Sequence, residues 1–319
     1  MGKFWDFVVM MANESFPPKP TWTTEDVPDL TGKVIIVTGG NSGLGLELTK
    51  VLVSRNATVY IACRSKERAV IALEEIKADT NGREAKFLHL DLADLDSVRT
   101  GAEEFLRNET RLDILYNSAG VMIPPMEQLS AQGYDLQMGT NVLGHFYLTK
   151  LLLPTLLATA TLEPGSYNKP RIVTVSSGAH HLHDIDYATL KDGPERRRLG
   201  TQALYAQSKY ASVVFARELA RRYGDQGLVS IAMNPGNLKT NLQKEVAGWQ
   251  RVIVDWMLHS VLPNGILTHL YAGTAEEAAD YNGKYLIPWA RLGKARTDTQ
   301  DPKRGEELWA WLEEQVNNR

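Results

Sequence analysis

A glycine-rich turn between an apolar run and a helical pattern is the feature that most constrains the fold of this chain. Residues 34–37 are apolar and β-branched, the turn TGGNSGLG occupies 38–45, and a helical pattern extends to residue 55. Glycine allows a tight turn and lets a ligand approach the backbone without side-chain interference. A helix that begins at such a turn offers unpaired N–H groups and the positive end of its dipole to an anion. The segment therefore predicts a strand, an anion-binding turn and a helix in succession.

The same alternation of apolar runs and helical patterns continues along the chain. Strands are expected at 34–37, 58–62, 87–90, 112–116, 171–175, 229–233 and 284–287. Helices are expected at 43–55, 66–78, 95–107, 131–157, 203–223 and 242–270. Strands that are apolar throughout and are joined by helical crossovers favour a parallel sheet covered on both faces. We therefore expect an α/β fold, a doubly wound parallel sheet of the Rossmann type in a single domain.

Proline residues divide a short N-terminal segment from the body of the chain, and a polar insertion interrupts the alternation later on. Pro17, Pro18 and Pro20 precede the body, and the insertion occupies 178–202. A final helix is predicted after Asp301, which a proline follows. Its apolar stripe is expected to pack on the core: Leu308, Trp309, Leu312 and Val316. The expected division is an N-terminal extension at 1–29, a main domain at 30–300 that includes a segment at 237–275, and a C-terminal helix at 301–319.

Charge and cysteine content restrict the partners and the compartment. The formal net charge is -3, whereas a nucleic-acid-binding surface is strongly basic, so we expect no nucleic-acid partner. The single cysteine, Cys63, excludes an internal disulfide and fits a cytoplasmic, reducing compartment. Residues 4–11 are mostly apolar but fall short of the about 20 residues that span a bilayer. They fit either a short helix packed on the body or a peripheral membrane contact.

The residues after the second and third strands bear on the choice of ligand. A glycine turn at the first crossover of such a sheet is typical of dinucleotide-binding sites, and a site for NAD places an acid after the second strand to bind the ribose 2′-hydroxyl. This chain has Cys63 and Arg64 there. Because a guanidinium suits a 2′-phosphate, we expect NADP(H) rather than NAD(H), a solvated charge being the alternative for Arg64. Asp91 and Leu92, after the third strand, are expected beside the adenine on position alone.

A tyrosine and a lysine in one helical pattern form the second chemical signal. Tyr205 and Lys209 are four residues apart and would share one helix face. A phenol of pKa about 10 is ill suited to reversible proton transfer at neutral pH, and a nearby cation lowers that pKa. A hydroxyl is also needed to orient the substrate oxygen, and Ser177 is expected to provide it. Ser176 is the structural alternative, because successive strand residues face opposite sides.

These motifs, in this order, resemble those of the short-chain dehydrogenase/reductase superfamily over nearly the whole chain from about residue 30. The family's T-G-x-x-x-G-x-G motif begins at Thr38, N-N-A-G at Asn117 and P-G-x-x-x-T at Pro235. The resemblance implies four catalytic residues: Ser177, Tyr205, Lys209 and Asn141. It implies that the cofactor is bound by Gly39, Asn41, Ser42, Gly43, Leu44, Gly45, Arg64, Asp91, Leu92, Asn117, Ala119, Gly120, Tyr205, Lys209, Pro235, Gly236, Leu238 and Thr240.

The resemblance also implies a role for each catalytic residue. Tyr205 would be the acid/base, Lys209 would tune it and bind the nicotinamide ribose, and Ser177 would hold the substrate oxygen. Asn141 would position a water that links Lys209 to solvent, and Thr240 with its loop would fix the nicotinamide carboxamide. The chain would then contribute orientation and electrostatics, while the cofactor carries the hydride.

Two departures from the family pattern refine the resemblance. Ser118 stands in place of the second asparagine of N-N-A-G, and the insertion at 178–202 lengthens the separation between the catalytic serine and tyrosine. This long loop, the segment Ala62-Cys63-Arg64 and the extended C-terminal part resemble the branch of retinol dehydrogenase-like and WW-domain oxidoreductase-like proteins. Members of that branch mostly act on apolar alcohols and carbonyls.

The expected activity is hydride transfer between NADP(H) and a carbonyl, or a primary or secondary alcohol, of a fairly apolar small molecule. The segment 237–275 contains Trp249, Trp256 and Met257, which we expect in a lid over the substrate, core packing being the alternative. A cofactor-binding regulator or scaffold with little turnover is the alternative function. An epimerase or dehydratase of the extended relatives is disfavoured, because their turn usually resembles G-x-x-G-x-x-G. A homodimer and a peripheral membrane contact remain open.

Two clusters of basic and imidazole side chains are expected to have no special chemistry. His180, His181 and His183 lie in the insertion without a cysteine or carboxylate set to complete a metal site, so we expect loop histidines and no metal. The three arginines at 196–198 are expected to be a solvated charge run, with an anionic membrane or substrate contact as the alternative.

Overall fold

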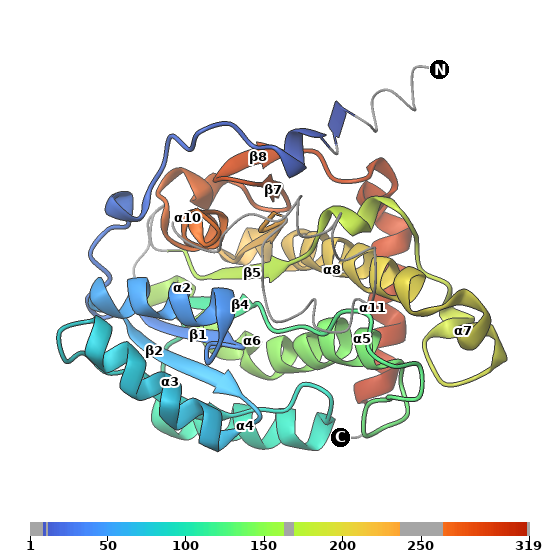
Figure 1. Cartoon of the computed structure of the whole chain (residues 1–319), viewed down its shortest axis with the longest axis horizontal. Coiled ribbons are helices and arrows are strands. Elements are labelled where there is room, and N and C mark those ends of the chain that lie inside the picture. The colour runs from blue at the N-terminus through green and yellow to red at the C-terminus, as the bar shows by residue number, and fades with distance from the viewer. Residues whose placement is uncertain (1–8, 11, 163–168, 237–263, 318–319) are drawn as a thin grey trace, which may run out of the picture.

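The protein is built around one mixed but mainly parallel sheet (Figure 1). The computed structural model describes residues 9–10, 12–162, 169–236 and 264–317. In the described part the strand order is β3-β2-β1-β4-β5-β6-β7-β8, and only the β7–β8 pair is antiparallel. The strands are β1 (Val34–Thr38), β2 (Thr58–Cys63), β3 (Lys86–His89), β4 (Ile114–Asn117), β5 (Arg171–Val175), β6 (Val229–Met233), β7 (Tyr285–Ile287) and β8 (Arg291–Gly293).

In the described part of the chain, helices cover both faces of the sheet and form a large hydrophobic core on each. Alternate residues of β1 face opposite cores: Ile36 packs with one, and Ile35 and Val37 with the other. One face carries α4 (Leu95–Asn108), α6 (His145–Leu162), α8 (Thr201–Tyr223) and α11 (Pro302–Val316). The other carries α2 (Gly43–Ser54), α3 (Lys66–Asp79) and α10 (Leu267–Thr274). Burial on both sides explains why central strands such as β1 and β6 are mostly apolar.

The predicted doubly wound fold is confirmed, and the differences from the expected elements are local. The strand β8 was missed, because three residues with one exposed leucine carry no alternating pattern. The helix expected at 131–157 begins instead at α5 (Leu136–Met138), where the Asp135 side chain accepts hydrogen bonds from the N–H groups of Gln137 and Met138. A π-helical segment, Gly139–Gly144, then leads into α6. The helix expected at 242–270 falls mainly outside the described residues.

The C-terminal helix is confirmed in position. Asp301 accepts a hydrogen bond from the Lys303 N–H, and Pro302 occupies the first turn of α11. The four residues of its apolar stripe are all buried. In Figure 1, α11 (red) lies across the end of the molecule against α8. The stripe is therefore part of the core that supports α8, the helix on which Tyr205 and Lys209 lie.

The polar insertion contains a buried ion pair, and the expectation of a fully solvated arginine run is wrong for Arg196. This residue lies in α7 (Pro194–Leu199) and is 1% exposed. Its Nε donates to Asp135 Oδ2 at 2.9 Å, and its Nη1 donates to the Met126 carbonyl at 2.8 Å. Arg197 does remain accessible and pairs with Asp192. The insertion is thus attached to the start of α5 through a charge pair that a local charge pattern cannot reveal.

Loss of this buried pair should destabilise the protein far more than loss of its exposed neighbour. Arg196→Ala leaves the Asp135 carboxylate buried without its cation, so we expect a decrease of about 3–5 kcal/mol in the free energy of unfolding. Arg197→Ala, the matched control, should cost less than about 1 kcal/mol. Urea unfolding followed by circular dichroism measures both. Equal losses in the two variants would contradict this assignment of the insertion's anchor.

Candidate functional site

The candidate site lies at the carboxyl edge of the parallel strands. β1 and β4 are neighbours in the sheet, and the chain crosses from β1 to β2 in one direction and from β4 to β5 in the other. Open α/β sheets bind ligands at such a reversal, outside the carboxyl ends of the strands. The predicted site residues in the described part of the chain follow the strands β1 to β6. Residues Leu238 and Thr240, with most of the predicted lid at 237–275, lie outside the described residues.

The glycine turn after β1 is a close-packed cradle. Gly39 has φ +73° and Gly43 has φ +54°, conformations that favour glycine. A Cβ on Gly45 would lie 2.3 Å from the Gly39 carbonyl oxygen, so α2 can begin this close to β1 only with glycine there. Ser42 caps α2 without a side-chain hydrogen bond, which leaves the first N–H groups of the helix for a ligand. Asn41, Ser42 and Leu44 remain partly accessible along the same turn.

The ends of β2 and β3 place the predicted adenosine-binding residues beside this turn. The Gly39 N–H donates to the Ala62 carbonyl at 2.8 Å, which joins the glycine turn to the end of β2. Arg64 follows two residues later and is exposed, whereas Cys63 is buried and burial raises its pKa to about 11. Asp91 accepts a hydrogen bond from the Ala93 N–H in the loop after β3, and Leu92 is buried there. An exposed guanidinium at this edge can meet a phosphate.

The segment after β4 is held to the end of β1 by a single hydroxyl. Thr38 Oγ1 accepts hydrogen bonds from the N–H groups of Ser118 and Ala119 at 2.8 and 2.9 Å. The replacement of asparagine by Ser118 does not affect this contact, because the backbone N–H makes it. Asn117 is buried and donates from Nδ2 to Thr149. A Cβ on Gly120 would lie 3.0 Å from Asn141 Oδ1, so glycine keeps the space beside Asn141 open.

His145 is a supporting residue that the sequence reasoning missed. Its Nδ1 lies 3.0 Å from the Asn141 carbonyl and must donate to it, so Nε2 is unprotonated and faces the Thr38 hydroxyl at 2.9 Å. Burial lowers the pKa of His145 to about 4, which keeps the ring neutral at physiological pH. It joins the π-helical segment to the end of β1. Its position four residues after Asn141 was the available signal, but a lone histidine in an apolar helix is usually core.

Asn141 lies within the π-helical segment, with its side-chain amide fixed in orientation. Oδ1 accepts from the Val121 N–H at 2.9 Å, and Nδ2 donates to the Val121 carbonyl and to Ser208 Oγ at 3.0 Å. The position that a Cβ of Gly120 would occupy is 3.0 Å from Asn141 Oδ1 and 3.7 Å from Lys209 Nζ. The amide and the ammonium therefore flank one space beside Gly120. π-helical turns inside α-helices are frequent at functional sites.

Tyr205 and Lys209 lie on the same face of α8, close to the end of β5. Lys209 Nζ lies 5.8 Å from the centre of the Tyr205 ring and donates to the Val175 carbonyl at 3.0 Å. Burial lowers the pKa of Lys209 to about 8. Burial also raises the pKa of Tyr205 to about 12, although a hydrogen bond with Ser177 opposes this rise. The predicted lowering of the phenol pKa by Lys209 is therefore not found in this structure, because desolvation prevails and the ammonium is engaged with a carbonyl.

The two serines after β5 have different environments. Ser176 is buried and its Oγ donates to the Lys209 carbonyl at 2.7 Å, which ties β5 to α8. Ser177 is partly accessible and its hydroxyl faces Tyr205. His180 is fully buried behind this turn, with Nδ1 donating to the Ser177 carbonyl at 2.7 Å and Nε2 accepting from the Arg296 N–H at 3.2 Å. Burial lowers the pKa of His180 to about 3, so it supports the Ser177 turn as a neutral ring.

The residues after β6 complete the described part of the site. Gly236 has φ +98°, and a Cβ there would lie 3.0 Å from Pro288 Cγ, so this turn also requires glycine. The Gly236 N–H donates to Asn234 Oδ1 at 2.9 Å. Pro235 and Gly236 are both partly accessible. Within the described residues, no group of three His, Cys, Asp or Glu side chains is placed to hold a metal ion.

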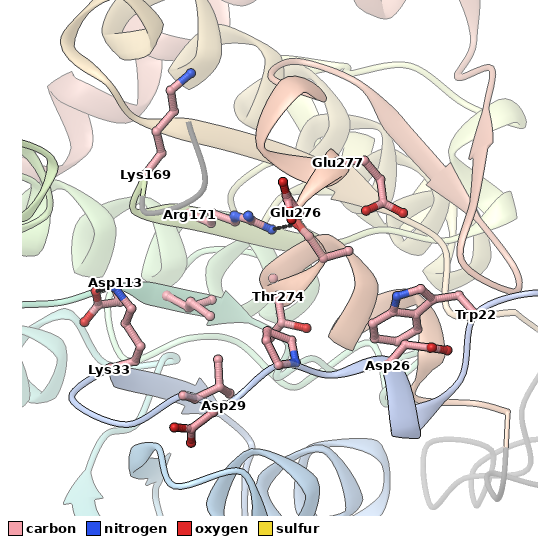
Figure 2. Close-up of a pocket in the computed structure, with 15 residues that line it drawn as sticks. Trp22, Asp26, Asp29, Lys33, Asp113, Lys169, Arg171, Thr274, Glu276 and Glu277 are labelled. Carbon is pink, nitrogen blue, oxygen red and sulfur yellow. Dashed lines mark hydrogen bonds and ion pairs between the residues drawn. The ribbon is translucent and has the colours of Figure 1, made fainter. Parts of the chain in front are cut away.

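A cavity of about 400 Å³ lies at the opposite edge of the sheet from this site (Figure 2). Its lining includes residues at or just before the start of β1, β4 and β5, among them Lys33, Asp113 and Arg171. Lys33 and Asp113 form an ion pair at 3.4 Å, and Arg171 donates to the Ala272 and Ala275 carbonyls. These charges are engaged with the protein itself. The cavity is therefore separate from the residues predicted to carry the chemistry.

The chain is similar in sequence to known proteins. The family model described as short chain dehydrogenase matches residues 33–191. A short-chain dehydrogenase/reductase of Armillaria gallica is 52% identical over 318 residues, covering 100% of both chains. Human retinol dehydrogenase 12 is 36% identical and covers 88% of this chain and 85% of its own.

Solved structures share the fold. A protein from Mycobacterium paratuberculosis superimposes with a TM-score of 0.69 at 29% identity, covering 92% of this chain and 96% of its own. A short chain dehydrogenase from Shigella flexneri, solved in complex with NADP, has a TM-score of 0.60 at 24% identity, covering 81% of this chain and 98% of its own.

The buried neutral state of His145 predicts a dependence of stability on pH. Its pKa is about 4 in the folded protein and about 6.5 in an unfolded chain. Between these values only the unfolded state binds the proton, so the free energy of unfolding falls as the pH falls from 6.5 to 4, by up to about 1.4 kcal/mol per pH unit for this residue. His145→Gln should make the slope of the unfolding free energy against pH shallower, by the contribution of at most one bound proton. Urea unfolding at several pH values tests it, and an unchanged slope would contradict the neutral state.

Proposed function

This chain belongs to the short-chain dehydrogenase/reductase family, and on that premise we propose that it transfers a hydride between NADP(H) and an apolar alcohol or carbonyl. The substrate oxygen would belong to a carbonyl or to a primary or secondary alcohol. The observation that carries the proposal is the convergence of Ser177, Tyr205, Lys209 and Asn141 at one edge of the sheet, beside the glycine turn. The family supports an oxidoreductase that uses NAD(P), and the choice between the two cofactors is part of the proposal.

The residues of the chain supply the proton and hold the reacting groups. When bound, the reduced nicotinamide supplies the hydride to the carbonyl carbon. The Ser177 hydroxyl would hold the carbonyl oxygen, and the Tyr205 hydroxyl would donate its proton to that oxygen as the alcohol forms. Burial keeps the phenol protonated, since its pKa is raised to about 12, which suits the direction of reduction. Lys209 would bind the nicotinamide ribose, and Asn141 would hold the water that relays a proton from solvent to Lys209.

The cradle after β1 supports a dinucleotide as the cofactor. Gly39, Gly43 and Gly45 leave room for a pyrophosphate where a Cβ would intrude or where φ is positive, and the open N-terminus of α2 favours its charge. The exposed Arg64, placed after β2 where an acid would select NAD, supports NADP(H). The Shigella flexneri relative binds NADP with the same fold, which is consistent with this choice.

The branch of the family supports an apolar substrate. Human retinol dehydrogenase 12 is named for an apolar alcohol, and it is similar to this chain over most of its length. Trp249, Trp256 and Met257 lie in the segment predicted to cover the substrate, and their composition fits an apolar lid.

We propose a cytoplasmic enzyme, with a peripheral membrane contact through the N-terminal segment as an open alternative.

Removal of the phenol hydroxyl should abolish turnover without loss of cofactor binding. NADPH oxidation is measured across graded aliphatic, aromatic and polycyclic aldehydes and ketones for the wild type, Tyr205→Phe and the control Tyr223→Phe, which lies at the far end of α8. We expect at least about a hundredfold loss of kcat in Tyr205→Phe, the contribution typical of a general acid, with the NADPH Kd within about twofold. Normal turnover by Tyr205→Phe would disprove the mechanism. Tight NADPH binding by the wild type without turnover on any substrate would favour a regulator.

Reversal of the charge at Arg64 should shift the choice of cofactor. Arg64→Glu removes the partner of the 2′-phosphate and offers a carboxylate to a ribose hydroxyl, so we expect the ratio of kcat/KM for NADPH over NADH to fall at least about tenfold. Lys77→Glu, an exposed charge reversal near the far end of α3, is the matched control and should leave the ratio unchanged. An unchanged ratio in Arg64→Glu would rule out this residue as the selector.

A further inference from the structure

A carboxylate from the N-terminal segment is buried beside the loop that follows β6. Glu14 lies in a short helical stretch that includes residues 12–15, well before the first strand, yet it is only 4% exposed. Most of its neighbours in sequence are partly or fully accessible. A carboxylate is rarely buried unless a partner holds it. Its burial therefore points to a specific contact rather than to general packing of an apolar face.

The contact of Glu14 leads directly to the backbone of the predicted nicotinamide segment. Asn234 Nδ2 donates to Glu14 Oε2 at 2.7 Å, across a sequence separation of 220 residues. The other end of the same amide, Asn234 Oδ1, accepts from the Gly236 N–H at 2.9 Å. The carboxylate fixes which way the amide points, because a flipped amide would place its oxygen against the carboxylate and its NH₂ group against an N–H donor. Asn234 is itself 4% exposed, so these bonds are shielded from water.

A second set of contacts keeps the N-terminal segment in this position. Arg291, in β8, donates to the side-chain oxygen and to the carbonyl of Asn13 at 2.7 and 2.8 Å. Its Nε donates to the Pro288 carbonyl, and Pro288 is the residue against which Gly236 packs. Figure 1 shows the N-terminal segment passing along β8. His181 Nε2 lies 3.7 Å from Oε1, the other carboxylate oxygen of Glu14. Arg291 and Pro288 thus form a common support for the N-terminal segment and for the turn at Gly236.

We propose that Glu14 is a positioning residue for the nicotinamide half of the cofactor, acting through the Asn234 amide on the backbone of Pro235 and Gly236. This inference rests on the proposed function, because it assumes that the turn after β6 receives the nicotinamide. The N-terminal segment is then part of the binding site's support, although it lies far from the glycine turn in sequence. Glu14 itself need not touch the cofactor.

The proposal predicts an effect confined to one end of the dinucleotide. Without the carboxylate, the Asn234 amide can rotate and the Gly236 N–H loses its fixed acceptor, so the turn is no longer held in its binding conformation. Among the described residues, no hydrogen bond or ion pair joins the glycine turn or Arg64 to this support, so the adenosine end should be bound as before. A general loss of structure would weaken both ends.

The test compares binding of NADPH with binding of adenosine 2′,5′-bisphosphate, a probe of the adenosine end alone, by calorimetry on the full chain. For Glu14→Ala we expect the NADPH Kd to rise about tenfold and the bisphosphate Kd to stay within about twofold of wild type. Glu14→Gln keeps an oxygen acceptor for Asn234 and should restore most of the NADPH affinity. Lys19→Ala, an exposed charge on the same segment, is the control and should change neither Kd.

Two further outcomes separate this inference from the proposed function. If Glu14→Ala shows the split in Kd and the wild type has no turnover, the inference is supported and the reaction is rejected, whereas a wild-type protein that binds no NADPH would overturn both. Equal weakening of both ligands, or no change in either, would overturn the inference alone. If Glu14→Ala fails to fold, Asn234→Ala decides, because it removes the link between the carboxylate and the Gly236 N–H. That variant should show the same split in Kd, and equal weakening of both ligands, or no change in either, would overturn the proposal.

Discussion

The close approach of the end of β1 to the end of β4 is the constraint on which the rest of the site depends. Thr38 Oγ1 receives two backbone N–H groups from the segment after β4, and Gly39 leaves only enough room for Ala119 beside it. His145 then connects the same hydroxyl to the Asn141 carbonyl. One small polar side chain thus fixes the distance between the cofactor cradle and the π-helical segment. A larger residue at this point would separate the two halves of the site.

Burial determines the protonation states in the site more strongly than charge pairing does. Lys209, Tyr205 and His145 all have pKa values moved toward the neutral form, with desolvation as the main cause. A phenol whose pKa is raised to about 12 stays protonated at neutral pH, and a lysine whose pKa is about 8 lies beside it and shares a space with Asn141. In the proposed reaction the same low-dielectric surroundings would strengthen each hydrogen bond to the substrate oxygen.

The sequence predicts the parts of the structure that arise from local rules, and misses those that arise from distant contacts. The glycine turn, the crossover helices and the i, i+4 pair of Tyr205 and Lys209 follow from backbone conformation and helical period. Arg196 looked like a surface charge because its partner, Asp135, lies 61 residues away. β8 was too short and too polar to show a pattern. The π-helical segment also gives no signal in the sequence, because its residues fit an ordinary helix and only tertiary packing shifts their hydrogen bonds.

This division extends to the two ends of the candidate site. The turn proposed to bind the pyrophosphate is assembled from residues 38–45 and their immediate neighbours, and local motifs therefore suffice to locate it. The turn after β6 depends instead on Glu14 and on the β7–β8 hairpin, through Asn234 and Pro288. If the proposed function holds, substitutions in the N-terminal segment will alter how the nicotinamide is held and leave the phosphate-binding turn unchanged. The support of the turn after β6 is encoded outside the motifs, because its contacts come from the N-terminal segment and from the β7–β8 hairpin.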